Sequence, residues 1–126
     1  MYAPIDLPVQ SETIQRVTNG RPYFFFVGAL HPRKNLVNLF KAFDIYKKTD
    51  VLNTVLLVAG ARKWWTGDIA DVYENMTCKQ DVVFAGRLET PDMLRVMGSA
   101  IALTYVSYFE GFGIPIVEAF RCGTPV

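Results

Sequence analysis

The most restrictive feature of this sequence is a short apolar run that ends at a glycine and recurs along the chain. The runs are Tyr23–Val27 before Gly28, Thr54–Ala59 before Gly60, and Asp81–Ala85 before Gly86. Continuous apolar runs of this length are typical of strands that are buried on both faces of a sheet. We therefore expect three buried strands at these positions.

Segments with helical spacing separate the runs. Leu36, Leu39, Phe40 and Phe43 recur on one helix face, which predicts an amphipathic helix over 36–48. Asn35 is the expected N-cap of that helix. The remaining expected elements are a short helix over 11–18, a weaker helix over 68–77, a helix from Thr90 as N-cap to about 98, a strand over 101–105, a helix over 114–121 that ends at Gly123, and the start of a fifth strand at 124–126.

The alternation of strand and helix, four times over, predicts a parallel α/β sheet with helices on both faces. Residues 1–20 are polar and contain two prolines, so they are expected to form a linker or entering segment. Residues 21–126 are expected to form the domain itself.

Composition excludes several classes of function. The chain has 126 residues and a formal net charge of +1, which gives no general attraction for nucleic acid or an acidic membrane surface. Its apolar runs are too short to span a bilayer, and the N-terminus does not resemble a secretory signal. The two cysteines form no CxxC or zinc-type cluster, so a reduced, cytoplasmic setting is expected.

Glycines and basic residues gather where the expected strands end. The set comprises Gly28, Gly60, Gly86, Gly111, Gly113, Arg33, Lys34, Arg62, Lys63 and Arg87. In parallel sheets, ligands bind beyond the carboxyl ends of the strands. Backbone that allows close approach, together with basic side chains, suits a phosphorylated ligand.

Arg33 and Lys34 lie just before the expected helix over 36–48. Free N–H groups and the helix dipole favour an anion there, and the two side chains add full positive charges. A pyrophosphate group fits this arrangement. The alternative is an ordinary solvated basic loop.

Two glutamates, Glu110 and Glu118, stand eight positions apart in an otherwise apolar stretch. Gly111 and Gly113 would let the backbone near Glu110 approach a ligand and present N–H groups to it. Glu118 lies on the next helix, where a carboxylate can bind the vicinal hydroxyls of a ribose. The alternatives are an exposed turn acid at Glu110 and a helix-dipole carboxylate at Glu118.

These residues carry a resemblance to a known family. The segment E-G-F-G-I-P-I-V-E, Glu110–Glu118, resembles the E-x7-E motif of retaining glycosyltransferases with the GT-B fold, specifically the large GT4 family. The segment V-G-A-L-H-P-R-K-N, Val27–Asn35, is similar to that family's phosphate loop. The ordered series of matches covers roughly residues 21–126. It implies a Rossmann-like domain that binds a nucleotide-sugar donor, which is half of a GT-B fold.

The resemblance also implies roles for individual residues. Gly28, Arg33 and Lys34 would bind the donor diphosphate, and Glu118 would hold the ribose hydroxyls. Glu110 would be the catalytic carboxylate facing the donor sugar. The remaining implied contacts are the backbone of Gly111, Phe112 and Gly113 at the sugar, and Arg87 and Leu88 along the base. Many family members carry arginine where this chain has Ala29, and Arg33 would supply that charge here.

The family's reaction transfers a sugar from a UDP- or GDP-linked donor with retention of configuration and without a metal or a further cofactor. The acceptor would be a glycan or a lipid-linked sugar in polysaccharide or glycoconjugate biosynthesis. The resemblance further implies that an acceptor domain precedes this segment, that the chain is a truncated donor domain, and that it has little activity alone. Peripheral association with the inner face of the membrane, and dimerisation through the truncated edge, are additional expectations.

Three other functions are alternatives to glycosyl transfer for a chain of this kind. A non-catalytic nucleotide-sugar binding module would share the same residues. A dinucleotide oxidoreductase would need GxGxxG after the first strand, which reads Gly28-Ala-Leu-His-Pro-Arg33 instead. A receiver domain would need paired acids after the first strand, and these do not occur.

Three smaller features near the expected site have simple structural interpretations. His31 is expected to pack within its loop, with ligand orientation as the alternative. Trp64 and Trp65 are expected to pack rather than to stack on a base or sugar. Tyr105 and Tyr108 flank Glu110 and are expected to shape the sugar pocket.

Overall fold

The structure, a computed structural model, describes residues 12–62, 65, 67–110 and 112–126. Its strands are β1 (Tyr23–Val27), β2 (Val55–Ala59), β3 (Val82–Gly86) and β4 (Ala102–Leu103). Its α-helices are α1 (Glu12–Thr18), α2 (Leu36–Lys47), α3 (Gly67–Glu74), α4 (Thr90–Ser99) and α5 (Ile114–Cys122), and the short 3-10 helices are η1 (Pro32–Lys34) and η2 (Lys79–Asp81).

The strands form one parallel sheet in the order β3-β2-β1-β4, which confirms the predicted fold class. Phe25 lies at the centre, beside Leu57 of β2 and Leu103 of β4. The chain moves outward from β1 to β2 and β3, and then returns to place β4 on the other side of β1. The loops after β1 and β4 therefore lead to helices on opposite faces of the sheet, α2 and α5, and this point is where open α/β sheets bind ligands.

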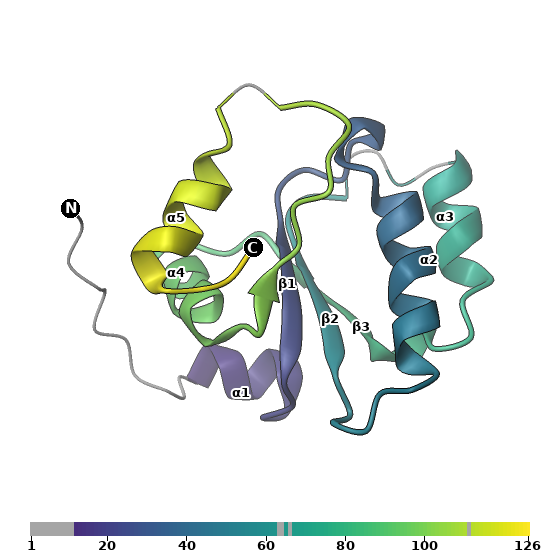
Figure 1. Cartoon of the computed structure of the whole chain (residues 1–126), viewed down its shortest axis with the longest axis horizontal. Helices are drawn as coiled ribbons and strands as arrows, with labels where there is room; N and C mark the ends of the chain where they lie inside the picture. The colour runs from purple at the N-terminus through teal and green to yellow at the C-terminus, as the bar shows by residue number, and fades with distance from the viewer. Residues whose placement is uncertain (1–11, 63–64, 66, 111) are drawn as a thin grey trace.

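Helices cover both faces of the sheet, as Figure 1 shows: α2 and α3 lie on one side, and α1, α4 and α5 on the other. Side chains alternate along β1, so that Phe26 packs in the cluster with α2 and α3 while Tyr23 and Phe25 pack in the cluster with α1 and α4. Every residue of β2 is buried. β2 is therefore buried on both faces, as its continuous apolar run predicted, whereas β3 at the edge of the sheet is fully buried only at Val82.

Helix α2 buries the four residues that the periodicity predicts, namely Leu36, Leu39, Phe40 and Phe43. Its N-cap differs from the prediction in chemistry. Asn35 occupies that position with a positive φ of 64°, and its side chain makes no capping hydrogen bond. The Asn35 side-chain N–H instead donates to the carbonyl oxygen of Val106, at 3.0 Å. Packing against the loop after β4 has taken the place of capping.

The predicted cap at Thr90 is wrong by one residue. Thr90 is the first residue of α4, Pro91 follows it within the first turn, and Glu89 occupies the N-cap position without a side-chain capping bond. Proline fits either of the first positions, because their N–H groups have no partner within the helix. The C-cap predicted for α5 is confirmed, since Gly123 has a φ of 72°.

The last strand is shorter than predicted. Ala102–Leu103 replaces the expected strand over 101–105, and Ile101 is 38% exposed. The Leu103 N–H donates to the carbonyl oxygen of Pro125 at 2.7 Å, so residues 124–126 run beside β4 at the position expected for a fifth strand. They have no strand assignment of their own.

Residues 12–18 of the expected entering segment form α1, whose Ile14 is buried in the cluster with Tyr23 and Phe25. The predicted cap Ser11 lies outside the described residues. No helix in the described part of the chain is long and apolar enough to cross a membrane.

Candidate functional site

Three predicted site residues meet where the loops after β1 and β4 approach each other. Arg33 Nη1 donates to Glu110 Oε2 at 2.9 Å, and Lys34 Nζ donates to Glu110 Oε1. Ser107 Oγ donates to the same Oε1 at 2.8 Å. We call Arg33, Lys34, Ser107 and Glu110 the Glu110 cluster. Its position between β1 and β4 is the ligand-binding position expected for this sheet order.

The Glu110 carboxylate is held in its charged form. Burial disfavours ionisation, but hydrogen bonds from Lys34 and Ser107 and the positive charges of Lys34 and Arg33 outweigh it and lower the pKa of Glu110. The side chains of Lys34 and Glu110 are only 12% and 16% exposed, while that of Arg33 is 35% exposed. One carboxylate facing two cations leaves the cluster with an excess positive charge that can attract an anion.

Local backbone bonds shape the loop that carries Arg33 and Lys34. His31 precedes η1, and its Nδ1 accepts the Arg33 N–H at 3.1 Å, so the imidazole caps this short helix. The Lys34 N–H donates to the carbonyl oxygen of His31 at 2.8 Å. The loop after β4 joins the same unit, because the Tyr108 N–H donates to the carbonyl oxygen of Arg33 at 2.9 Å. Packing of His31 within its loop, as predicted, thus has a definite role in presenting the two cations.

Two glycines bring the strand ends close together. A Cβ on Gly60 would lie 1.8 Å from the carbonyl oxygen of Gly28, so no side chain fits there. Gly28 has a φ of 139°, and a Cβ at this position would lie 3.7 Å from Lys34 Nζ. The open side of Gly28 therefore lies against the ammonium group of the Glu110 cluster.

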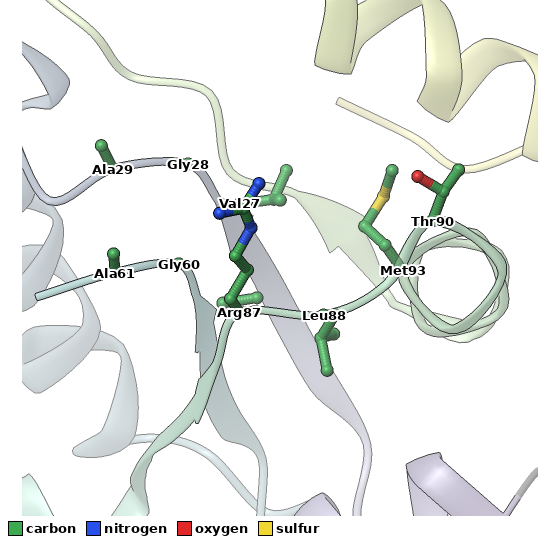
Figure 2. Close-up of a pocket in the computed structure, with 10 residues that line it drawn as sticks. Val27, Gly28, Ala29, Gly60, Ala61, Arg87, Leu88, Thr90 and Met93 are labelled. Atoms are coloured by element: carbon green, nitrogen blue, oxygen red, sulfur yellow. The ribbon is translucent and has the colours of Figure 1, made fainter.

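A cavity of about 340 Å³ opens beyond the ends of β1, β2 and β3 (Figure 2). Its walls are mostly backbone and apolar side chains, and Arg87 is the only charged residue among the described residues that line it. The lining residues are Val27, Gly28, Ala29, Ala59, Gly60, Ala61, Arg87, Leu88, Thr90 and Met93. Gly28 thus borders both this cavity and Lys34, and the predicted base contacts Arg87 and Leu88 lie on the cavity's far wall. An apolar wall with few polar groups suits a planar base.

The second glutamate lies in a different environment. Glu118 is half-buried on α5, and burial raises its pKa, with an opposing contribution from the positive charge of Arg121. Its charge also acts on the Cys122 thiol, whose pKa is raised first by burial and then by Glu118. Burial is therefore the main influence on the Glu118 carboxylate, and a neutralising or hydrogen-bonding partner would favour its charged form. Glu118 is not part of the Glu110 cluster.

The predicted sugar contacts are only partly described. Gly111 lies outside the described residues. Phe112 has 93% of its surface exposed, and Gly113 has a φ of 67° at the start of α5.

Some residues predicted for the same edge have other partners. The Arg62 guanidinium lies 3.8 Å from the ring centre of Phe84 and 5.0 Å from that of Trp65, so it stacks on aromatic rings. Trp65 packs against the core beside Phe40, in agreement with the packing interpretation. Trp64 and Lys63 lie outside the described residues.

Sequence reasoning missed Ser107 and the two lining residues Thr90 and Met93. The spacing of Ser107, three residues before Glu110, is the signal that could have found it, because short turns bring such side chains together. Thr90 and Met93 follow from the first turn of α4, which faces the cavity. Within the described residues, no group of three His, Cys, Asp or Glu side chains is placed to hold a metal ion.

Comparison with known sequences agrees with this geometry. Residues 10–126 match the family described as "Glycosyl transferases group 1". The chain is 30% identical over 104 residues to O-antigen chain mannosyltransferase B of Escherichia coli, which covers 82% of this chain and 27% of that protein. It is 31% identical over 104 residues to O-antigen chain mannosyltransferase RfbU of Salmonella typhimurium, covering 82% of this chain and 28% of that protein.

Solved structures share the fold. WaaG, a glycosyltransferase involved in lipopolysaccharide biosynthesis, aligns with a TM-score of 0.71 at 24% identity, over 90% of this chain and 30% of that one. The Anabaena protein HepE in complex with UDP-glucose aligns with a TM-score of 0.73 at 20% identity, over 99% of this chain and 36% of that one. The chain spans between a quarter and a third of the length of the two mannosyltransferases. The family match extends over almost the whole chain, and the protein belongs to the group 1 glycosyltransferases.

Proposed function

We propose that the protein binds a nucleoside-diphosphate sugar at the carboxyl edge of its sheet and transfers the sugar to an acceptor hydroxyl. One observation carries this proposal: Arg33, Lys34 and Glu110 converge between β1 and β4, directly beside the cavity that Gly28 borders. Family membership supports the class of reaction, and the geometry supports a place for the charged part of the donor.

The donor would lie across both parts of the site. Its diphosphate would bind Lys34, Arg33 and the backbone at Gly28, where positive charge and open backbone occur together. Its base would enter the cavity along Arg87 and Leu88. The ribose hydroxyls would bind Glu118, because two hydroxyl donors would meet the preference of a half-buried carboxylate for a hydrogen-bonding partner.

The sugar would lie near Glu110 and the N–H groups of Gly111, Phe112 and Gly113. In the reaction, the bond between the sugar's anomeric carbon and the diphosphate oxygen breaks, and a bond to the acceptor oxygen forms. The acceptor proton passes to the departing phosphate on the same face, so the configuration is retained. Lys34 and Arg33 would stabilise the negative charge that develops on the leaving group.

The classes of donor and acceptor that we propose are based on the names of the similar proteins. A hexose donor linked to UDP or GDP fits the names of the two O-antigen mannosyltransferases and the UDP-glucose complex of HepE. An acceptor glycan or lipid-linked sugar in surface polysaccharide synthesis fits the same names and that of WaaG. A cytoplasmic location, peripheral membrane contact and dimerisation stay predictions.

Calorimetric titration with UDP and GDP tests this site, using the Lys34→Ala variant and Lys41→Ala as a matched control. Lys41 is exposed on α2, away from the carboxyl edge. Loss of a charge-assisted hydrogen bond corresponds to about a tenfold to hundredfold weaker affinity. We expect that loss in Lys34→Ala and a change below about twofold in Lys41→Ala, as for other surface substitutions.

Two results would reject the assignment. One is equal affinity of wild type and Lys34→Ala for the nucleotide that binds. The other is the absence of binding by a folded protein. Transfer of a radiolabelled sugar from the matching donor to a glycan acceptor would then separate an enzyme from a binding module.

A further inference from the structure

The hydroxyl group of Tyr105 is buried and has no hydrogen-bond partner among the described residues. Buried hydroxyl groups almost always have a partner, because losing water without replacement is unfavourable. Tyr105 lies just after β4, at the start of the loop that carries Glu110. An unpartnered hydroxyl at that place calls for an explanation connected with the site.

The hydroxyl lies close to both parts of the Glu110 loop. It is 3.6 Å from the position that a Cβ on Gly113 would occupy. The pKa of Tyr105 is raised by burial first and then by the negative charge of Glu110, with Arg33 acting in the opposite direction. The phenol therefore stays protonated and can donate a hydrogen bond, and Glu110 is the anion whose charge acts on it.

Glu110 has other partners in this structure, and two of them, Arg33 and Lys34, are the groups assigned to the donor diphosphate. Its two carboxylate oxygens accept from Arg33, Lys34 and Ser107. A diphosphate arriving at Arg33 and Lys34 would compete with the carboxylate for the same N–H groups and would repel its charge. Glu110 would then need a neutral donor to replace the cations.

We propose that donor binding exchanges the partners of Glu110: Arg33 and Lys34 pass to the diphosphate, and the Tyr105 hydroxyl takes over a carboxylate oxygen of Glu110. Tyr105 is thus a positioning residue, which acts through Glu110. Among the described residues this hydroxyl has no partner, because Glu110 pairs with the cations. This inference rests on the proposed function, since it needs the diphosphate to bind Arg33 and Lys34.

The substitution Tyr105→Phe separates this role from a structural one. Removing a hydroxyl that has no partner leaves the melting temperature unchanged or higher. Removing a hydroxyl that binds Glu110 only in the complex weakens UDP or GDP affinity by about tenfold. Both quantities can be measured on the same preparation, by thermal unfolding without nucleotide and by calorimetric titration.

Tyr46→Phe is the matched control. The Tyr46 hydroxyl already has partners, Asp50 Oδ1 at 3.2 Å and Thr54 Oγ1 at 3.3 Å, at the opposite edge of the sheet. We expect a lower melting temperature and a change in nucleotide affinity below about twofold. In the Glu110→Gln background, Tyr105→Phe should weaken affinity by clearly less than it does in the wild type, because the charged acceptor is gone.

The outcomes distinguish the two proposals. A Tyr105→Phe protein that melts earlier but binds nucleotide normally overturns the partner exchange, as does one with no change in either quantity while Lys34→Ala loses binding. The proposed function survives both of these results. If Lys34→Ala binds as tightly as the wild type, or if the folded wild type binds neither UDP nor GDP, the proposed function fails and the exchange fails with it.

Discussion

The two edges of the sheet each carry a group of paired charges, and they differ in how completely those charges are satisfied. At the amino edge, Asp50 and Asp81 pair with Lys47 and Arg21, and we call these four residues the Asp50 cluster. The Asp50 side chain is 1% exposed and accepts from Lys47 Nζ, the Thr54 and Leu52 N–H groups and the Thr54 hydroxyl. At the carboxyl edge, the Glu110 cluster lies next to Gly28, which lines a cavity, and its charges act on the Tyr105 hydroxyl, which has no partner in the described part of the chain.

This difference is the one expected between a structural ion pair and an ion pair at the proposed binding site. The Asp50 cluster closes the turn between α2 and β2. The Glu110 cluster has excess positive charge and room beside it, which suits a ligand that arrives later. Perturbed carboxylates occur in both places, so position on the sheet and incomplete satisfaction, rather than pKa alone, indicate the binding edge.

The largest expected effect comes from a substitution that breaks the Asp50 cluster. Asp50→Ala leaves the buried charge of Lys47 without its closest partner and should lower the free energy of unfolding by about 3–5 kcal/mol. Urea denaturation measures this loss. Asp92→Ala is the control, because Asp92 forms an exposed pair with Arg95 at 3.5 Å and should change stability by less than about 1 kcal/mol. Equal effects of the two substitutions would show that the Asp50 cluster is no more structural than a surface pair.

Acid should weaken the same cluster next. Burial opposes ionisation of Asp50, but its hydrogen bonds from Lys47, Thr54 and Leu52 prevail and hold its pKa far below the ordinary value. A lowered folded pKa gives stability that is complete above the unfolded pKa, near pH 4, and is lost as pH falls toward the folded pKa. The lowered pKa of Glu110 acts with the same sign, and the raised pKa of Glu118 with the opposite one.

Unfolding measured between about pH 5 and pH 2 tests this expectation. The wild type should lose stability as the pH falls, and Asp50→Asn should lose clearly less over the same interval. An equal slope in both proteins would assign the acid sensitivity to other carboxylates.

The smallest expected effect concerns the loop at the carboxyl edge that carries Arg33 and Lys34. His31→Ala removes the acceptor for the Arg33 N–H and should lower the free energy of unfolding by about 1 kcal/mol, as loss of an N-cap does. Nucleotide affinity should fall by a few-fold, because Arg33 and Lys34 are then less well held. His31→Asn supplies another acceptor and should restore most of both quantities. If Ala and Asn behave alike, the imidazole does not position this loop.

The strands and helices were predictable because each rule that defines them is local. The alternating faces of β1 and the buried face of α2 follow from residue type and spacing, and both agree with the structure. The caps at Asn35 and Thr90 were less predictable. The Asn35 side chain contacts Val106 instead of capping α2, and α4 begins one residue earlier than its capping residues indicate. The brevity of β4 could not be read from its apolar residues, because pairing with β1 covers only Ala102 and Leu103.

The site was predictable as a set of residues at one edge, but not as a set of contacts. Sequence order places Arg33, Lys34 and Glu110 beyond strand ends, yet their mutual ion pairs join positions 76 and 77 residues apart. Helical spacing places Arg121 and Cys122 one turn from Glu118, but it does not show that these residues lie apart from the Glu110 cluster. These contacts depend on which charged side chains pack together in the folded structure, and packing cannot be deduced from residue spacing.

The hydrogen bonds that join the loops after β1 and β4 have a consequence for the order of folding. They connect Arg33 with Tyr108 and Asn35 with Val106, so they close a long segment of chain that includes β2 and β3. Contacts at such separation form late, because the entropy of closing the loop is lost before the contacts can stabilise it. A folding intermediate with β1, β2 and β3 in place would hold both cations but lack the carboxylate that pairs with them. Formation of the ion pairs between Glu110 and the two cations during refolding would therefore report the docking of β4, and not the assembly of the sheet that precedes it.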